Sequence, residues 1–366
     1  MRAPTELVSL VFRNPDAIRR FSLGDWDRLV RQARQADLLA RLHILLRQGG
    51  LDGEIPAVAR WHFEVATALA ECQATEIQME LRQLRTMLEG LCIPLVVLKG
   101  AAYVAAGLIA ARGRHIDEID LLVPRERLNE VESALKLADW HSVELPEYDQ
   151  QYVHRWRHDA PSQQNLRRAT LINVHHAILP DTAGFRPDTA KLRRSAAEVT
   201  GFAGLFVPSP EDRILHTSTL LFHDDELPRG LRDLSDLDLQ LRQAATEADF
   251  WPRLLARAEE FELSRLLFYA LRYTRHFFDT PVPDEVYDLL ETAAPSRASL
   301  RLMDVIYIRM LAPNHHSCND ALTPLARHAT YLRAHWLRMP AHLLLPHLFH
   351  KAFISPFQDS SPAKAS

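Results

Sequence analysis

One stretch limits the fold of this chain more than any other, the run IPLVVLKGAAYVAAGLIAARGRHIDEIDLLVP from Ile93 to Pro124. It predicts a short apolar strand, a tight turn at Lys99-Gly100, a helix, a loop and a second strand. Successive side chains of a strand point to opposite faces, so Glu118 and Asp120 share one face and lie about 7 Å apart. Two carboxylates in this arrangement make a poor core and a good clamp for a divalent metal ion.

The turn after the first strand offers a place for a phosphate. A glycine there lets a ligand approach the backbone, and the helix that follows presents N–H groups and a positive dipole end. Lys99 is a flexible point charge that can reach a phosphate, and Gly100 allows the close approach. Arg112 and Arg114 precede the acidic strand and are candidates to clamp phosphates. The plain alternatives are a surface lysine, an ordinary strand-to-helix turn and solvated loop arginines.

The run LKG, a helix, an arginine and then EIDLLV resembles the uncharacterised nucleotidyltransferase family of the DNA polymerase β-like superfamily. That superfamily pairs a Gly-Gly or Gly-Ser turn with a D-x-D or D-x-E strand and adds a third carboxylate on a later strand. The resemblance implies an α+β fold built around a polymerase β-like palm, a mixed sheet with helices. It also implies transfer of a nucleoside monophosphate from a nucleoside triphosphate (NTP) to a hydroxyl-type acceptor, with release of pyrophosphate.

The resemblance assigns roles to particular residues. Glu118 and Asp120 would bind Mg²⁺ or Mn²⁺, and the NTP phosphates would be held by Lys99, Gly100, Arg112 and Arg114. The third acidic position, in a family pattern like E-x-H-W, falls here on Asn173-Val174-His175-His176. Asn173 can coordinate a metal through its carbonyl oxygen but carries no charge and is no general base. His175, on the same strand face, would help to complete the catalytic site; its alternative role is a packed histidine of the sheet.

These departures keep a second function open. Glu118 stands where the family usually has Asp, and Asn173 stands where it has an acid. A chain with both changes is also compatible with a catalytically impaired nucleotide-binding pseudoenzyme or an interaction protein.

A third, weaker hypothesis concerns the C-terminal half. His216 and His223 would share one face of a predicted helix, as in the metal sites of HD-type phosphohydrolases. The acidic residues near them in the sequence are Asp224, Asp225, Asp233 and Asp236. The alternative is that these histidines and aspartates cap helix ends.

The rest of the chain predicts helices around the palm. Residues 1–84 form a helical region with one helix from Trp26 to Gln48 and a longer one from about Ala57 to Glu89. The palm spans 85–208, with further strands at 141–145, at 169–179 and within 201–209. A C-terminal helical region, 209–354, begins with Pro210 after Ser209, and a disordered tail covers 355–366.

Composition excludes several classes of protein. The net charge of −4 does not indicate a positively charged surface for binding bulk DNA. Three widely spaced cysteines do not form a disulfide framework. No window approaches the roughly 18 apolar residues of a membrane span, and the N-terminus lacks a signal peptide's apolar core. We therefore expect a cytoplasmic protein without a membrane partner. The acceptor stays open among a small molecule, a peptide, a protein and an RNA end.

Overall fold

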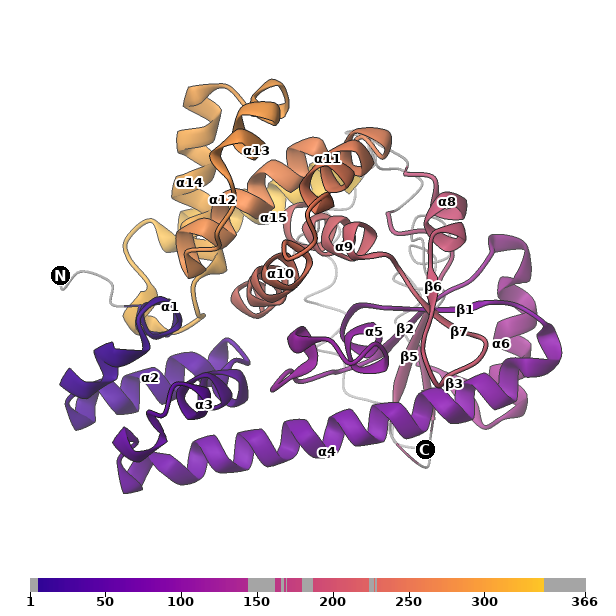
Figure 1. The fold of residues 1–366 in the computed structure, drawn as a ribbon, viewed down its shortest axis with the longest axis horizontal. Helices are drawn as coiled ribbons and strands as arrows, with labels where there is room; N and C mark the ends of the chain where they lie inside the picture. The colour runs from indigo at the N-terminus through magenta and orange to yellow at the C-terminus, as the bar shows by residue number, and fades with distance from the viewer. Residues whose placement is uncertain are drawn as a thin grey trace, which may run out of the picture.

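A seven-stranded mixed sheet lies beside a large group of helices in the computed structural model (Figure 1). The structure describes residues 6–143, 162–165, 168, 170–179, 187–223, 227 and 229–338. The strands are arranged in the order β3-β4-β5-β2-β1-β7-β6. Their bounds are β1 Leu95–Leu98, β2 Ile119–Leu122, β3 Trp140–Ser142, β4 Gln163–Asn165, β5 Leu171–His175, β6 Ala197–Glu198 and β7 Leu205–Val207.

The centre of the sheet combines both pairing directions. β1 runs antiparallel to β2 and parallel to β7, and β2 runs parallel to β5. In this register Leu98 pairs with Asp120, and Asp120 pairs with Asn173. Paired residues of neighbouring strands point to the same face of a sheet. The predicted α+β fold with a mixed sheet is confirmed, and its register places the two predicted metal-site positions side by side.

The outer strands differ in detail from the sequence prediction. The strand predicted at 141–145 is β3, and residues 144 and 145 lie outside the described residues. The strand predicted at 169–179 is the shorter β5, and that predicted within 201–209 is β7. The polar strand β4 (Gln-Gln-Asn) lies in the polar segment 146–168, for which the sequence allows a loop or an edge hairpin, because it shows no alternation of apolar and polar residues.

The N-terminal helices correct one prediction. The single helix expected from Trp26 to Gln48 is two helices, because Asp37 takes a left-handed φ of 59° and turns the chain. The apolar spacing continues across this turn since Leu38 is itself fully buried, and the sequence pattern therefore hides the break. The helices of this region are α1 Val8–Arg13, α2 Leu23–Gln35, α3 Leu39–Gln48 and the 32-residue α4 Ala57–Leu88.

The remaining helices flank the sheet or follow it. Pro210 begins α9 as predicted, and the Ser209 hydroxyl accepts a hydrogen bond of 3.2 Å from the Asp212 N–H. Within the palm lie α5 Lys99–Ala105, α6 Leu128–Leu137 and α8 Thr189–Arg194. The C-terminal helices are α9 Pro210–His223, α10 Gly230–Ala244, α11 Phe250–Glu260, α12 Ser264–Phe278, α13 Asp284–Leu289, α14 Arg297–Leu311 and α15 Thr323–Arg338.

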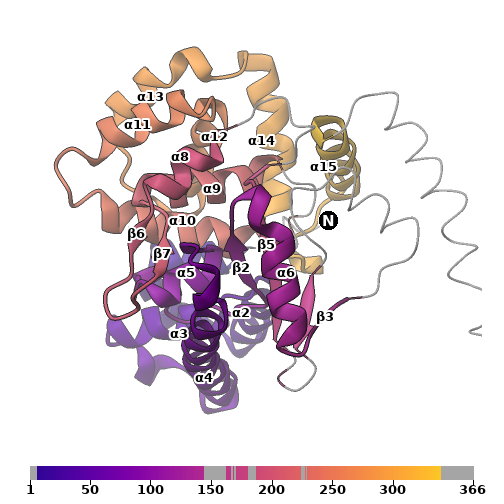
Figure 2. The same ribbon diagram turned by 90° about the vertical axis from the view of Figure 1, so that its right-hand side faces the viewer.

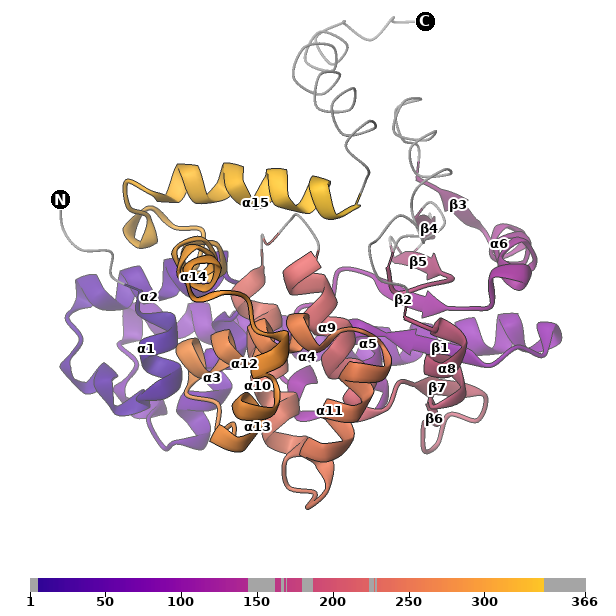
Figure 3. The same ribbon diagram turned by 90° about the horizontal axis from the view of Figure 1, so that it is seen from above.

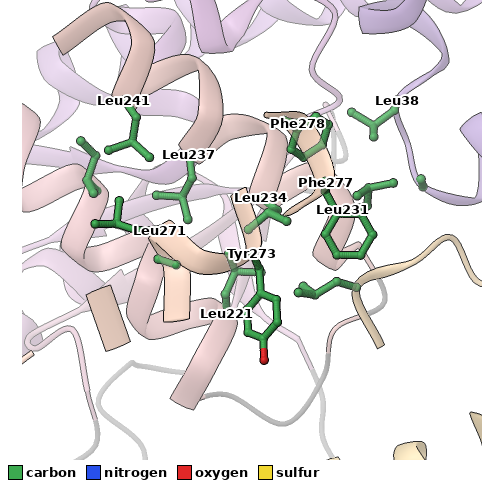
Figure 4. Close-up of a cluster of buried hydrophobic side chains, with 14 of the residues drawn as sticks. Leu38, Leu221, Leu231, Leu234, Leu237, Leu241, Leu271, Tyr273, Phe277 and Phe278 are labelled. Carbon is green, nitrogen blue, oxygen red and sulfur yellow. The ribbon is translucent and has the colours of Figure 1, made fainter. Parts of the chain in front are cut away.

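Two hydrophobic cores cover the two faces of the sheet. Val97 and Leu121 pack with α4, α5 and α6 on one face. Val96, Leu98 and Leu122 belong to the other core, which also joins the N-terminal and C-terminal helices. Figure 4 shows part of that core between α10 and α12, and Figures 2 and 3 show the helices beside the sheet. Asp120 and Asn173 share the face of Leu98, so they point toward the C-terminal helices.

None of the helices within the described residues combines the length and the apolar character needed to cross a bilayer. The three cysteines are free thiols; Cys72 and Cys92 are exposed, and Cys318 is buried. The division into 1–84, 85–208, 209–354 and a tail stays a prediction, since one core crosses two of these boundaries.

Candidate active site

Asp120 is the centre of a small buried group of polar side chains. It lies on β2 and is 1% exposed. Its Oδ1 atom is 2.8 Å from Lys99 Nζ, at the end of β1, and 2.7 Å from His175 Nε2 on β5. Three segments distant in sequence thus meet at one carboxylate oxygen, as the order β1-β2-β5 requires.

Lys99 reaches this position through an unusual turn. It directly follows the extended Leu98 and has a left-handed φ of 51°, which side chains other than glycine seldom adopt. The side chain is partly buried, and its ammonium group also lies 3.4 Å from Glu118 Oε1. A strained residue of this kind persists only where its surroundings hold it, and such residues cluster at functional sites. The Lys99 ammonium thus lies close to the carboxylates of both Glu118 and Asp120, the two predicted metal ligands.

The charges around Asp120 keep it ionised. Burial by itself raises the pKa of a carboxyl group. Here the ammonium of Lys99 and the hydrogen bond from His175 outweigh burial and hold the pKa of Asp120 below its ordinary value. Asp120 is thus a permanent negative charge in a nearly dry position, which is a strong site for a cation.

Asn173 stands beside Asp120 with an unsatisfied oxygen. Its side chain is 6% exposed, and its Oδ1 atom has no hydrogen-bond partner among the described residues. Leaving a buried acceptor unpaired costs about 1–3 kcal/mol. A bound cation or a ligand hydrogen-bond donor would remove that cost. The orphaned oxygen is the feature that distinguishes this group from an ordinary buried ion pair.

His216 on α9 belongs to the same neighbourhood. Its burial, together with the charges of Lys99 and His175, lowers its pKa to about 3, so its ring is neutral. The adjacent Thr217 contacts the Tyr103 hydroxyl of α5 at 3.0 Å, which fixes α9 against the palm. Sequence reasoning placed His216 only in the HD-type hypothesis. No local pattern reveals its place at the sheet, because the packing of α9 determines it.

Gly100 and Arg114 form a close contact with each other. A Cβ atom at Gly100 would overlap the Arg114 guanidinium, with 2.9 Å to its Cζ. Arg114 is buried and bonded to Asp236 of α10, with 2.6 Å between Nε and Oδ2. The predicted roles of both residues in phosphate binding stay predictions, and in this structure the Arg114 guanidinium packs directly against Gly100.

Arg112 lies apart from Lys99. It is exposed and lines a cavity of about 470 Å³ together with Phe12, Ile109 and Phe278. The lining includes none of the side chains that meet at Asp120. The structure therefore brings together Lys99, Glu118, Asp120, Asn173 and His175, and it does not bring Arg112 to them.

A comparison with protein families supports the resemblance found at Ile93–Pro124. The model of a family described as uncharacterised nucleotidyltransferase matches residues 22–279. The chain belongs to this uncharacterised nucleotidyltransferase family. The match includes the whole sheet and the helices from α2 to α12, and the family's description supports a general nucleotidyl transfer function. The comparisons with curated proteins and with solved structures found no match.

The members of the HD-type set that lie among the described residues are not brought together as a metal site in this member of the nucleotidyltransferase family. Asp233 and Asp236 both pair with Arg114, and Asp236 also pairs with Arg41. His223 is fully buried, and Asp224 and Asp225 lie outside the described residues. Within the described part of the chain, no group of three or more His, Cys, Asp and Glu side chains is arranged to hold a metal ion.

The donors around Asp120 nevertheless fit a hard divalent cation. Mg²⁺ takes oxygen ligands, keeps several waters and shares phosphate oxygens with its substrate, so it needs few protein ligands. Glu118 and Asp120 offer carboxylate oxygens, and Asn173 offers an unsatisfied carbonyl oxygen. Lys99 supplies the positive charge between the carboxylates in this structure. A metal would fit here once the Lys99 ammonium turns to another anion.

Proposed function

We propose that this protein transfers a nucleoside monophosphate from a metal-bound NTP to a hydroxyl-type acceptor and releases pyrophosphate. The observation that carries the proposal is the ionised, buried Asp120 beside the orphaned oxygen of Asn173. Family membership supports the class of reaction. The metal, the NTP and the acceptor are proposals of ours, and the acceptor is a small molecule, a peptide, a protein or an RNA end.

Each side chain at the site has a proposed task. Glu118, Asp120 and Asn173 hold Mg²⁺ or Mn²⁺, and His175 fixes the Asp120 carboxylate through its 2.7 Å contact. Lys99 would bind an NTP phosphate in place of the carboxylates, because its side chain is flexible and partly exposed. When bound, the ion polarises phosphate oxygens and favours loss of the acceptor proton. The neutral His216 adds no positive charge that would repel the metal.

The transfer itself requires one bond to form and one to break. The acceptor oxygen bonds to the α-phosphorus, and the bond from that phosphorus to the oxygen bridging to the β-phosphate breaks. Pyrophosphate leaves with the electron pair. Asn173 cannot accept the hydroxyl proton, and we propose that the proton passes to water. A reaction without a positioned base is expected to be slower, since such a base typically contributes 10²–10⁴-fold.

Thermal stabilisation tests the proposal without knowledge of the acceptor. ATP, GTP, CTP and UTP are each added with and without Mg²⁺ or Mn²⁺ to wild type and to Asp120→Asn. A ligand that binds only the folded protein raises its stability, by about 2.7 kcal/mol at 100 times Kd. We expect metal-dependent stabilisation by at least one NTP, lost in Asp120→Asn and kept in the control Asp117→Asn. No stabilisation by any NTP in wild type would sink the proposal.

The nearest alternative is a nucleotide-binding protein that does not transfer, and Asn173 is the residue that favours it. Asn173→Asp restores the missing acid. If the protein is an enzyme without its base, this variant should release pyrophosphate from the stabilising NTP up to about 10²-fold faster than wild type. Binding by both proteins, with no pyrophosphate from either, would favour the non-catalytic alternative.

A further inference from the structure

Helix α4 carries an uncovered apolar stripe on the side away from the rest of the protein. In Figure 1 this helix runs along one edge of the molecule, with the other described elements on one side of it. Its inner face buries Phe63 and Leu81. Its outer face exposes large apolar side chains, which are Val58 (70% exposed), Trp61 (57%), Val65 (44%), Leu69 (64%) and Met79 (54%). The exposed large apolar side chains are contiguous from Val58 to Leu69, and an exposed apolar patch of this kind marks an interaction site.

The stripe has the spacing of a coiled coil. Exposed positions recur from Val58 to Met79 at alternating intervals of three and four residues, the pattern of the a and d positions of a heptad repeat. Ala68, Cys72 and Thr75 occupy the positions between Val65 and Met79, and Leu69 lies beside them. We name as the outer seam the residues Val58, Trp61, Val65, Ala68, Cys72, Thr75 and Met79, all of them exposed. At 1.5 Å per residue the seam is about 32 Å long. A seam of this form is complementary to another helix with the same spacing.

We propose that the outer seam pairs with the outer seam of a second copy of this chain, in antiparallel orientation. One antiparallel register pairs six of the seven seam positions and leaves Val58 facing the partner's Arg82. It places Trp61 opposite the partner's Met79, a favourable contact between an aromatic ring and sulfur. It also places Ala68 opposite the partner's Cys72, so that two small residues meet near the two-fold axis. The contact is isologous and closes at a dimer.

Charge complementarity favours this orientation. The register brings His62 opposite the partner's Glu76 on both sides of the axis. Arg34 Nη2 lies 3.0 Å from His62 Nδ1, and an arginine only donates, so Nδ1 is the acceptor and Nε2–H is the donor. That N–H can be donated to the partner's Glu76. A parallel pair would place Glu71 against the partner's Glu76 at two places, whereas the antiparallel register places Glu71 against the partner's Glu71 at one place, near the axis. Neither glutamate has an ion-pair partner among the described residues to offset the repulsion, so the antiparallel pair carries less of it.

The size of the seam predicts a reversible dimer. A strip about 32 Å long and about 10 Å wide covers on the order of 300 Å² in projection on each subunit. A groove of about 310 Å³ adjoins it, lined among others by Trp61, Leu69, Arg34 and His115, and gives room for side chains of the partner. Two such strips sum to on the order of 600 Å² in projection, below the about 1,200 Å² of a standard specific interface, so the contact belongs to the weak, reversible class. We therefore expect the dimer to dissociate on dilution into the low micromolar range.

Sedimentation velocity from about 1 to 100 µM tests the dimer. We expect the average mass of wild type to rise toward that of a dimer and Val65→Lys to stay monomeric with unchanged thermal unfolding. Val305→Lys is the matched control, because Val305 on α14 is 43% exposed and Val65 is 44% exposed. Control and wild type should behave alike. A wild type that is monomeric throughout, or a Val65→Lys variant that dimerises like it, overturns the proposal.

Thiol cross-linking tests the orientation. The parent variant is Cys92→Ser, which leaves Cys72 as the exposed thiol, since Cys318 is buried. Adding Ala68→Cys places a thiol opposite the partner's Cys72, at the separation of facing seam positions that a disulfide can bridge. We expect mild oxidation to give a covalent dimer for the double variant and none for the parent. A covalent dimer of the parent alone would show the parallel pairing and overturn the register.

Discussion

Two buried aspartates in this protein are each held by positive side chains, and they differ in the kind of cation that holds them. Asp236 on α10 is 1% exposed and pairs with two guanidinium groups, Arg41 Nη2 at 2.8 Å and Arg114 Nε at 2.6 Å. Asp120 on β2 is equally buried but contacts a flexible lysine and a histidine. The first arrangement uses the planar, always charged side chain that suits buried ion pairs, and the second uses groups that can move or lose a proton.

The neighbours of the two aspartates sharpen the difference. Around Asp236, Arg41 also bonds Ser235 and the Ala110 carbonyl oxygen, and Arg114 also bonds the His115 carbonyl oxygen. Beside Asp120, the Asn173 oxygen has no partner in the described part of the chain. The two guanidinium groups that hold Asp236 make it a structural link between α3, α10 and the loop before β2. Gln240 Oε1 beside Asp236 also lacks a partner among the described residues, so the two regions differ in the cations that hold each aspartate rather than in an orphaned oxygen alone.

Asp236→Asn should cost the most stability. The change leaves two buried guanidinium groups facing a neutral amide, and removal of one partner from a buried ion pair costs about 3–5 kcal/mol. Asp120→Asn should cost less, about 1–3 kcal/mol, because the amide oxygen can still accept the hydrogen bond from His175 and because Lys99, 24% exposed, keeps Glu118 as a partner. Urea unfolding of both variants measures the difference, and a variant of Asp236 that fails to fold agrees with it. Equal losses for the two variants would remove the distinction between a structural and a functional aspartate.

Gly100→Ala should have the next largest effect, through the contact between the two regions. Its new methyl group would push against the Arg114 guanidinium, which is bonded to Asp236 and has little freedom to move. Overpacking of this kind costs about 1–3 kcal/mol. Gly53→Ala is the control, since nothing lies within 4 Å of a Cβ atom there, and it should change the free energy of unfolding by about 0.5 kcal/mol or less. If Gly100→Ala lost as little unfolding free energy as Gly53→Ala, the Arg114 side chain would have to move away from the new methyl group at almost no cost.

The sequence predicts the region around Asp120 better than the region around Asp236. The short run from Lys99 to Asp120 indicates the turn, the acidic strand and the family, because these features are local. The pairing of Asp120 with Asn173 depends on strand order, and the approach of His216 depends on how α9 packs. Arg114 looks like a loop arginine in sequence and becomes a buried structural side chain only through α10, which follows more than a hundred residues later. Local patterns carry the strands and most helices, whereas contacts made through the helical half have no sequence signal.

His216→Gln should have the smallest effect, visible only in the pH dependence of stability. In the folded protein the pKa of His216 is lowered to about 3, against about 6.5 in an unfolded chain. The unfolded state thus binds more protons below pH 6.5, so the stability that neutral His216 contributes is complete above that pH and is lost as the pH falls toward 3. Between pH 7.5 and 5.5, metal-free wild type should lose about 1 kcal/mol more than His216→Gln. The exposed His115→Gln is the control and should follow wild type. If urea unfolding gave parallel pH profiles for all three proteins, burial and the charges of Lys99 and His175 would not lower the pKa of His216 in the folded protein. The site around Asp120 would then respond to pH no differently from the cluster around Asp236.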